Sequence, residues 1–157
     1  MDIAWYIARW ALPLNVLTGH RPPPDERADE REACLLIARG EEVDADDLDV
    51  AYSAAGGAWI GGVMVGILLT SVSMALGDHV HPGFEILSFV SLLVMGLCLG
   101  LFLICHCRTW MLDRAHYAEP GTWTERIATR LSRPRAYDIV LAAAGSVWPA
   151  MWAAGYV

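Results

Sequence analysis

The side chains best suited to chemistry lie in a short polar segment between two long apolar runs. This segment holds Asp78, His79 and His81, and Glu85 follows closely. Carboxylate and imidazole groups are ligands for zinc and copper ions, so Asp78, His79 and His81 form a candidate metal site. Their spacing matches no strong metal motif, however, and alternate residues of a tight turn can point apart. An ordinary polar turn that includes a Pro-Gly pair is therefore the stronger interpretation.

Two further groups could hold a metal ion but have unsuitable spacing. Cys105-His106-Cys107 ends the second apolar run, and its two cysteines lie about 200° apart on a helix, so both thiols do not easily reach one ion. The acidic cluster at 44–49 has the carboxylates of a calcium loop but lacks the Gly of the turn and the closing Glu. No nucleophile–base arrangement stands out. The sequence thus predicts no cofactor and no enzymatic activity.

A transmembrane helical hairpin is expected to position these groups. Residues 50–77 carry no formal charge, and 86–105 form a second uncharged run. A helix needs about 20 apolar residues to cross the hydrocarbon core, and a spanning segment must satisfy its backbone internally. We therefore expect transmembrane helices at 50–77 and 86–107, joined by an external loop at 78–85. Two core helices of a soluble domain are the disfavoured alternative, because the runs are long and adjacent.

Small residues recur at four-residue spacing along both expected helices. These small-residue stripes comprise Gly57, Ala58, Gly61, Gly62 and Gly66 on the first helix, and Gly96 and Gly100 on the second. In lipid, helices associate through close backbone contact, which such stripes allow, so we expect a helix-packing interface. The stripes serve either the two helices of one hairpin or a homo-oligomer. The first helix has more small positions than one partner needs, which favours some oligomerisation.

The N-terminal residues are expected to lie on the membrane rather than cross it. A spanning helix over 1–19 would place Arg9 near its centre, which costs about 2.5–3.5 kcal/mol. An interfacial helix would instead hold Trp5, Tyr6 and Trp10 at headgroup depth. A helix docked against the hairpin is the alternative.

An acidic cytoplasmic segment follows at 20–49. After an extended proline linker, residues 28–39 are expected to form a short helix that Gly40 ends. Asp44 is placed to cap the next helix, which continues into the first membrane run.

Residues 108–136 form a basic cytoplasmic segment. Its first part is expected to extend the second membrane helix, and a capping box, Thr122 to Glu125, starts a further helix. That helix is amphipathic, and the arginines expected at the membrane surface are Arg126, Arg130, Arg133 and Arg135. Such a helix suits an anionic leaflet, although a partner-binding groove helix has the same pattern.

A third transmembrane helix is expected at 137–157, where 139–157 is an apolar run just long enough to span. A re-entrant or interfacial helix is the alternative. The whole chain, 1–157, is then one all-α integral membrane domain with short cytoplasmic and interfacial amphipathic helices.

Composition and charge agree with a small membrane protein. The chain has 157 residues, is 55% hydrophobic and has a net charge of −7, which disfavours nucleic acid as a partner. All its basic side chains apart from histidine are arginine, which suggests a GC-rich bacterial genome. Because arginine-rich flanks stay inside, we expect the cell (inner or plasma) membrane with the N-terminus cytoplasmic.

Three functions remain open. The first is a non-enzymatic membrane subunit that oligomerises, or anchors an unidentified protein partner through its cytoplasmic segments, with the lipid bilayer as its other partner. The second is a holin-like oligomeric pore or membrane-disrupting protein, an analogy of size and hairpin topology only. The third is metal handling through the external histidine loop. The uncharged membrane runs disfavour an ion carrier.

Overall fold

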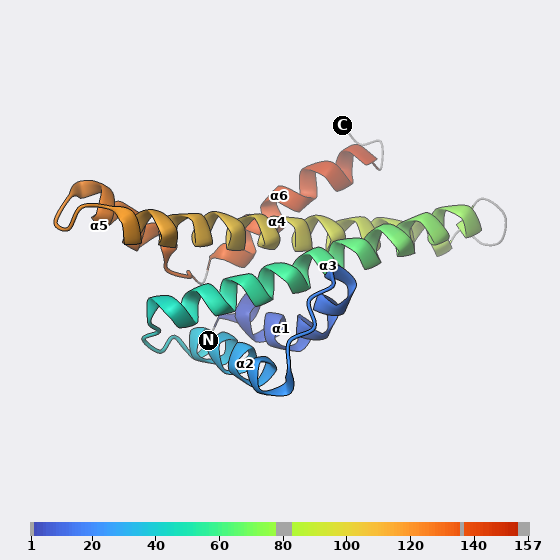
Figure 1. The fold of residues 1–157 in the computed structure, drawn as a ribbon. Coiled ribbons are helices and arrows are strands. Elements are labelled where there is room, and N and C mark those ends of the chain that lie inside the picture. The colour runs from blue at the N-terminus through green and yellow to red at the C-terminus, as the bar shows by residue number, and fades with distance from the viewer. Residues whose placement is uncertain (1, 78–82, 136, 154–157) are drawn as a thin grey trace.

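The computed structural model describes residues 2–77, 83–135 and 137–153, and these residues form helices without any strand. In chain order the helices are α1 (Ile3–Ala11), the 3₁₀ helix η1 (Leu12–Thr18), α2 (Pro24–Arg39), α3 (Ala45–Gly77), α4 (Gly83–Tyr117), α5 (Trp123–Ser132) and α6 (Asp138–Ala153). Figure 1 shows α3 and α4 as the two long helices on which the others are arranged.

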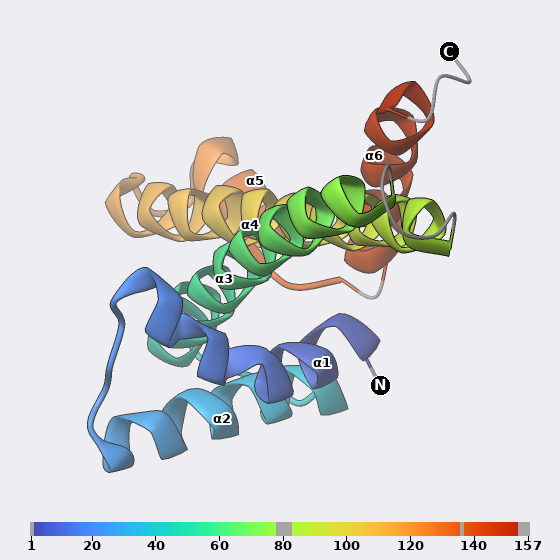
Figure 2. The same ribbon diagram turned by 90° about the vertical axis from the view of Figure 1, so that its right-hand side faces the viewer.

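The expected hairpin is formed by α3 and α4, which pack side by side in opposite directions (Figures 1 and 2). Both helices are long and apolar enough to cross a membrane. With 33 and 35 residues they reach about 50 Å each, well beyond the roughly 30 Å of a hydrocarbon core. As expected, α3 continues from the acidic segment without a break, and α4 continues to Tyr117. α4 begins at Gly83, three residues earlier than expected.

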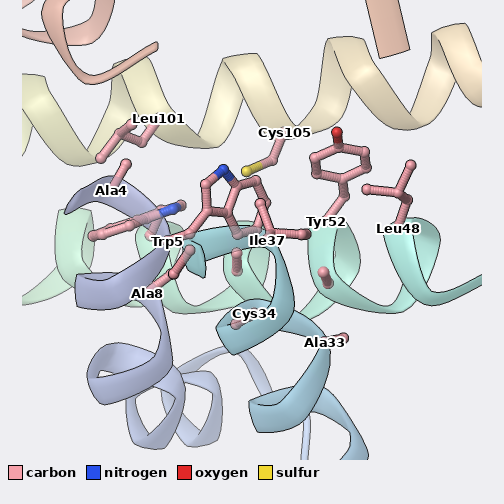
Figure 3. Packing of buried hydrophobic residues seen from close by; sticks show 14 of the residues in the cluster. Ala4, Trp5, Ala8, Ala33, Cys34, Ile37, Leu48, Tyr52, Leu101 and Cys105 are labelled. Atoms are coloured by element: carbon pink, nitrogen blue, oxygen red, sulfur yellow. The ribbon is translucent and has the colours of Figure 1, made fainter. Parts of the chain in front are cut away.

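The N-terminal elements α1, η1 and α2 form a layer against the first half of α3 (Figure 2). Its core contains Trp5, Cys34 and Ile37 of the layer together with Tyr52 of α3 (Figure 3). The ring centroids of Trp5 and Tyr52 lie 5.3 Å apart. The alternative of a docked helix therefore describes α1 in this structure.

The placement of Trp5 differs from the expectation of headgroup depth. Its side chain is only 4% exposed, whereas Trp10 is 67% exposed. The reason is that α1 is apolar on two faces. Ala4 and Ala8 lie beside Trp5 on the buried face, and small residues there let the helix approach α2 and α3 closely. Ile3 and Ile7 lie on the exposed face.

Local sequence signals end and start the helices as predicted. Gly40 ends α2 in the left-handed conformation, with a φ of 77°. Asp44 accepts a hydrogen bond of 2.8 Å from a backbone N–H in the first turn of α3. Thr122 caps α5 by accepting from the Glu125 N–H at 3.3 Å. α2 starts at Pro24, before the expected residue 28, because proline is suited to the first turn of a helix.

The third apolar segment, expected at 137–157, forms α6, which packs on α4 and runs antiparallel to it (Figure 1). Its 16 residues, Asp138–Ala153, extend about 24 Å, and residues 154–157 of the expected span lie outside the described residues.

Candidate functional site

A buried ion pair joins α4 to α6. Arg108, on α4, donates from Nη2 to both carboxylate oxygens of Asp138, the first residue of α6, at 2.5 Å each. The two side chains are only 8% and 5% exposed. A hydrogen-bonded arginine–carboxylate pair of this kind is strong and geometrically specific. The pair therefore fixes the start of α6 at one position along α4.

The same arginine also holds the connection between α5 and α6. Its Nη1 donates to the carbonyl oxygen of Leu131 at 3.0 Å and to that of Arg133. On the other side of the connection, the hydroxyl of Tyr52 donates to the carbonyl of Ser132. Tyr52, Arg108, Asp138 and the carbonyls of residues 131–133 are called the polar cluster below. Parts of α3, α4, α5 and α6 meet there.

The position of the polar cluster follows from the sequence of α4. Arg108 is the first charged residue after the apolar run of this helix, and an unpaired charge there would be costly to bury. Asp138 cancels that charge, and it also accepts a 3.1 Å hydrogen bond from the Arg135 N–H. Because the two buried charges neutralise each other and join different helices, the cluster stabilises the packing of these helices. The Nε of Arg108 is buried and has no acceptor within the described parts of the chain.

A groove of about 350 Å³ lies next to the polar cluster, between α4, the end of α5 and the start of α6. Its wall is largely aliphatic, and its remaining lining residues include Arg108, Asp138, Arg135 and Tyr137. The aliphatic residues are Leu103, Ile104, Met111, Leu131 and Leu141. The guanidinium of Arg135 lies 5.5 Å from the centroid of the Tyr137 ring. The groove thus combines apolar walls with a cation among its lining residues.

The small-residue stripe of α3 is divided between two neighbours. A Cβ added at Gly62 or Gly66 would lie 2.9 Å from a side-chain atom of Cys98 or Met95 on α4. Gly57 and Gly61 instead face η1, where a Cβ would meet Asn15 Oδ1 at 2.8 Å and the carbonyl oxygen of the residue before it at 2.5 Å. Ala58 is fully buried, in a small cluster with Leu12 and Ala54.

The small-residue stripe of α4 faces α6. A Cβ at Gly96 would lie 2.7 Å from the Cβ of Ser146, and one at Gly100 would lie 3.0 Å from Ala142. All the glycines of both stripes therefore make close contacts within a single chain.

Asn15 explains why η1 lies so close to α3. Its Nδ2 donates a 3.1 Å hydrogen bond to the carbonyl oxygen of Ala54, while the residue is only 3% exposed. Gly57, one turn further along α3, leaves room for this side chain. A second contact, the 2.6 Å pair between His20 and Glu30, joins the proline linker to α2.

The four arginines expected at the membrane surface fall into two groups. Arg126, Arg130 and Arg133 are exposed, whereas Arg135 is half-buried and lines the groove. The apolar face of α5 is also exposed, and it comprises Trp123, Ile127 and Leu131. Arg126, Arg130 and Arg133 therefore belong to an amphipathic surface, while Arg135 belongs to the groove.

The expected metal residues Asp78, His79 and His81 lie outside the described residues. Within the parts that are described, no group of three or more His, Cys, Asp or Glu side chains could hold a metal ion. Cys105 is buried beside Trp5 in the core (Figure 3), whereas Cys107 is exposed. The burial of Cys105 and the exposure of Cys107 agree with the angle of about 200° expected between them on a helix.

At the level of sequence, Arg108 is covered only as part of the basic segment 108–136, and its pairing with Asp138 is not predicted. Tyr52 and Asn15 were missed as well. The available signal was a charge at the end of one apolar run and an opposite charge at the start of the next. Such a pattern indicates that a pair is required but does not identify the partner.

Comparison of the chain with protein-family models, with curated proteins and with solved structures found no match. Its function has to be inferred from its own residues and their contacts.

Proposed function

We propose that this protein is a non-enzymatic membrane subunit that anchors a partner protein at the cytoplasmic face of the cell membrane. The observation that carries the proposal is the tight packing of α1, η1 and α2 on α3. Cys34 and Ala51 in this core are fully buried, and Tyr52 is 1% exposed. The layer is therefore a rigid extension of the hairpin, and its outer surface is held at a defined place next to the membrane.

Exposed apolar side chains support insertion of α3, α4 and α6 in a bilayer. Ile67, Leu68 and Val72 on α3 are about half exposed or more, and so are Ile86 and Val94 on α4. Contiguous apolar surface of this kind is unusual on a soluble monomer and is expected where lipid covers it. In this arrangement the polar cluster lies at the cytoplasmic boundary, where α4 changes from apolar to charged residues.

The orientation follows from the arginines. Residues 108–135 contain six arginines, whereas 83–107 contain none. Since arginine-rich flanks are retained inside, α5 and the acidic helix α2 lie on the cytoplasmic side. Residues 78–82, between α3 and α4, then lie outside.

The α2 side of the N-terminal layer, together with the start of α3, is strongly acidic, whereas α1 and η1 expose apolar side chains such as Ile3, Trp10 and Leu17. Residues 24–49 contain eleven acidic side chains and three arginines, and all of these acids except Glu30 are exposed. An anionic leaflet repels such a surface, so it points away from lipid and suits a partner with a basic patch. We expect that partner to be held mainly through α2.

Anchoring of a partner is favoured over homo-oligomerisation. The small-residue stripes, which could have formed a subunit interface, are used within one chain, where α4, α6 and η1 cover the glycines. A second copy of the chain would have to bind through other surfaces.

The test is photo-crosslinking in cells of the native host. A photoreactive amino acid replaces exposed Glu32 on α2 or, as the control, exposed Ile67 on the apolar face of α3. We expect one defined protein adduct from Glu32 and none from Ile67. No adduct at Glu32, or adducts only with a second copy of the chain, would overturn the anchoring role. Depolarisation of cells on expression would favour the pore instead.

A further inference from the structure

The groove beside the polar cluster has three features that together indicate a ligand. Its wall is largely apolar, Arg135 is one of its lining residues, and Arg108, another lining residue, has a buried Nε–H without an acceptor among the described residues. An aliphatic wall suits a hydrocarbon chain. A cation suits an oxygen-rich anionic group at the end of that chain.

We propose that this groove binds one anionic glycerophospholipid of the cytoplasmic leaflet. One acyl chain lies along Leu103, Ile104 and Leu141, and the phosphate lies beside Arg135. The volume of about 350 Å³ is at the lower end of the range for small-molecule sites, which suits part of one lipid.

The surrounding charge is complementary to such a lipid. Residues 108–136 carry six arginines against three acids, and Arg108 is already neutralised by Asp138. Among the described residues, Arg135 makes no ion pair with a carboxylate side chain; it donates to the carbonyl of Arg130 and to the hydroxyl of Tyr137. Basic pockets at the cytoplasmic ends of membrane helices bind anionic headgroups for this reason.

The level of the groove relative to the proposed membrane also suits a bound lipid. Its aliphatic wall begins on the apolar part of α4 at Leu103 and continues past Arg108 to Met111. In the proposed membrane arrangement this stretch crosses the boundary between acyl chains and headgroups. A lipid with its phosphate near Arg135 would therefore keep its normal depth in the leaflet.

The inference rests on the membrane location proposed above, and carbonate extraction tests that location separately. A chain that carbonate releases from membranes is not integral, and both proposals fail. An integral chain without lipid preference overturns only the lipid site.

The experiment is native mass spectrometry of the detergent-purified protein titrated with phosphatidylglycerol or with phosphatidylcholine of the same acyl chains. We expect one phosphatidylglycerol per chain and weaker binding of phosphatidylcholine. Arg135→Gln should weaken phosphatidylglycerol binding about fivefold, because one arginine near a lipid surface contributes about that factor. Arg126→Gln, which removes an exposed arginine outside the groove, should leave it within about twofold.

A second pair of variants tests the apolar wall. Leu141→Trp fills the groove and should lower binding at least about tenfold, whereas Val140→Trp, on an exposed neighbouring position of α6, should not. The proposed site would be overturned if both lipids bind equally well, or if Arg126→Gln and Arg135→Gln weaken binding equally. It would also be overturned if folded Leu141→Trp binds the lipid as the wild type does. If Leu141→Trp does not fold, the two arginine variants decide.

Discussion

Asp138→Asn should be among the most destabilising single substitutions of this chain. It leaves the Arg108 guanidinium buried, with its side chain 8% exposed and its partner charge removed. Removing one member of a buried ion pair costs about 3–5 kcal/mol. Asparagine keeps an acceptor for Arg108 and for the Arg135 N–H, so we expect the lower end, about 3 kcal/mol. That value corresponds to roughly a hundredfold change in the ratio of folded to unfolded chains.

The assay is equilibrium unfolding in mixed micelles of increasing dodecyl sulfate content, followed by tryptophan fluorescence. The matched control is Glu41→Gln, which breaks the exposed Arg39–Glu41 pair at 3.6 Å, where both side chains are about half exposed. Such pairs contribute about 0.2–1 kcal/mol. A cost for Asp138→Asn no larger than that of Glu41→Gln would refute the assignment of a buried pair.

A double variant separates the charge from the hydrogen bonds. Arg108→Leu with Asp138→Leu removes both charges and should cost less than the two single changes added together. It still leaves the Leu131 and Arg133 carbonyls without their donor, at about 1–3 kcal/mol each, so wild-type stability should not return. Strict additivity would contradict a direct pair.

Three further outcomes are expected. Gly57→Ala should destabilise the chain by about 1–3 kcal/mol in the same unfolding assay, because the new Cβ meets Asn15, and Asn15→Ala should relieve most of that cost. Gly96→Val should detach α6 from α4, which protease sensitivity of the C-terminal segment would report. Burial raises the pKa of the Cys34 thiol from 9.0 to about 12, so its protonated form contributes stability that is fully present below pH 9 and is lost as the pH rises towards 12. Cys34→Ala should reduce this alkaline loss, whereas Cys107→Ala should not, as unfolding at pH 8 and 11 would show.

Each of these outcomes has a contradicting result. An equal cost of Gly57→Ala in the wild-type and Asn15→Ala backgrounds would show that Gly57 and Asn15 do not touch. Gly145→Ala, where an added Cβ has nothing within 4 Å, is the control for Gly96→Val and should leave α6 protected. An identical pH dependence of Cys34→Ala and the wild type would show that the Cys34 thiol is not buried.

The parts of the fold that could be predicted depend on local sequence. Two long uncharged runs predict two apolar helices, and Gly40, Asp44 and Thr122 mark helix ends through residues only a few positions away. These signals need no knowledge of the tertiary structure. They therefore survive in α3, α4 and the start of α5.

The polar cluster could not be predicted, because its contacts join residues far apart in the chain. Arg108 and Asp138 are separated by 30 positions, and Tyr52 and Ser132 by 80. The docking of α1 was ambiguous for another reason. Both faces of α1 are apolar, so the hydrophobic pattern alone does not show which one is buried. In the structure the face with Trp5 and the small residues Ala4 and Ala8 is the buried one.

In the proposed membrane arrangement, the ion pair between Arg108 and Asp138 also limits how the junction of α4 and α6 responds to membrane voltage. A single charge carried across a bilayer gains or loses about 2.3 kcal/mol for every 100 mV. Arg108 and Asp138 are in direct contact, so they carry no net charge as a unit, and any displacement moves both together. The membrane potential therefore does almost no work on this junction, and α6 should stay docked whether the cell is energised or depolarised.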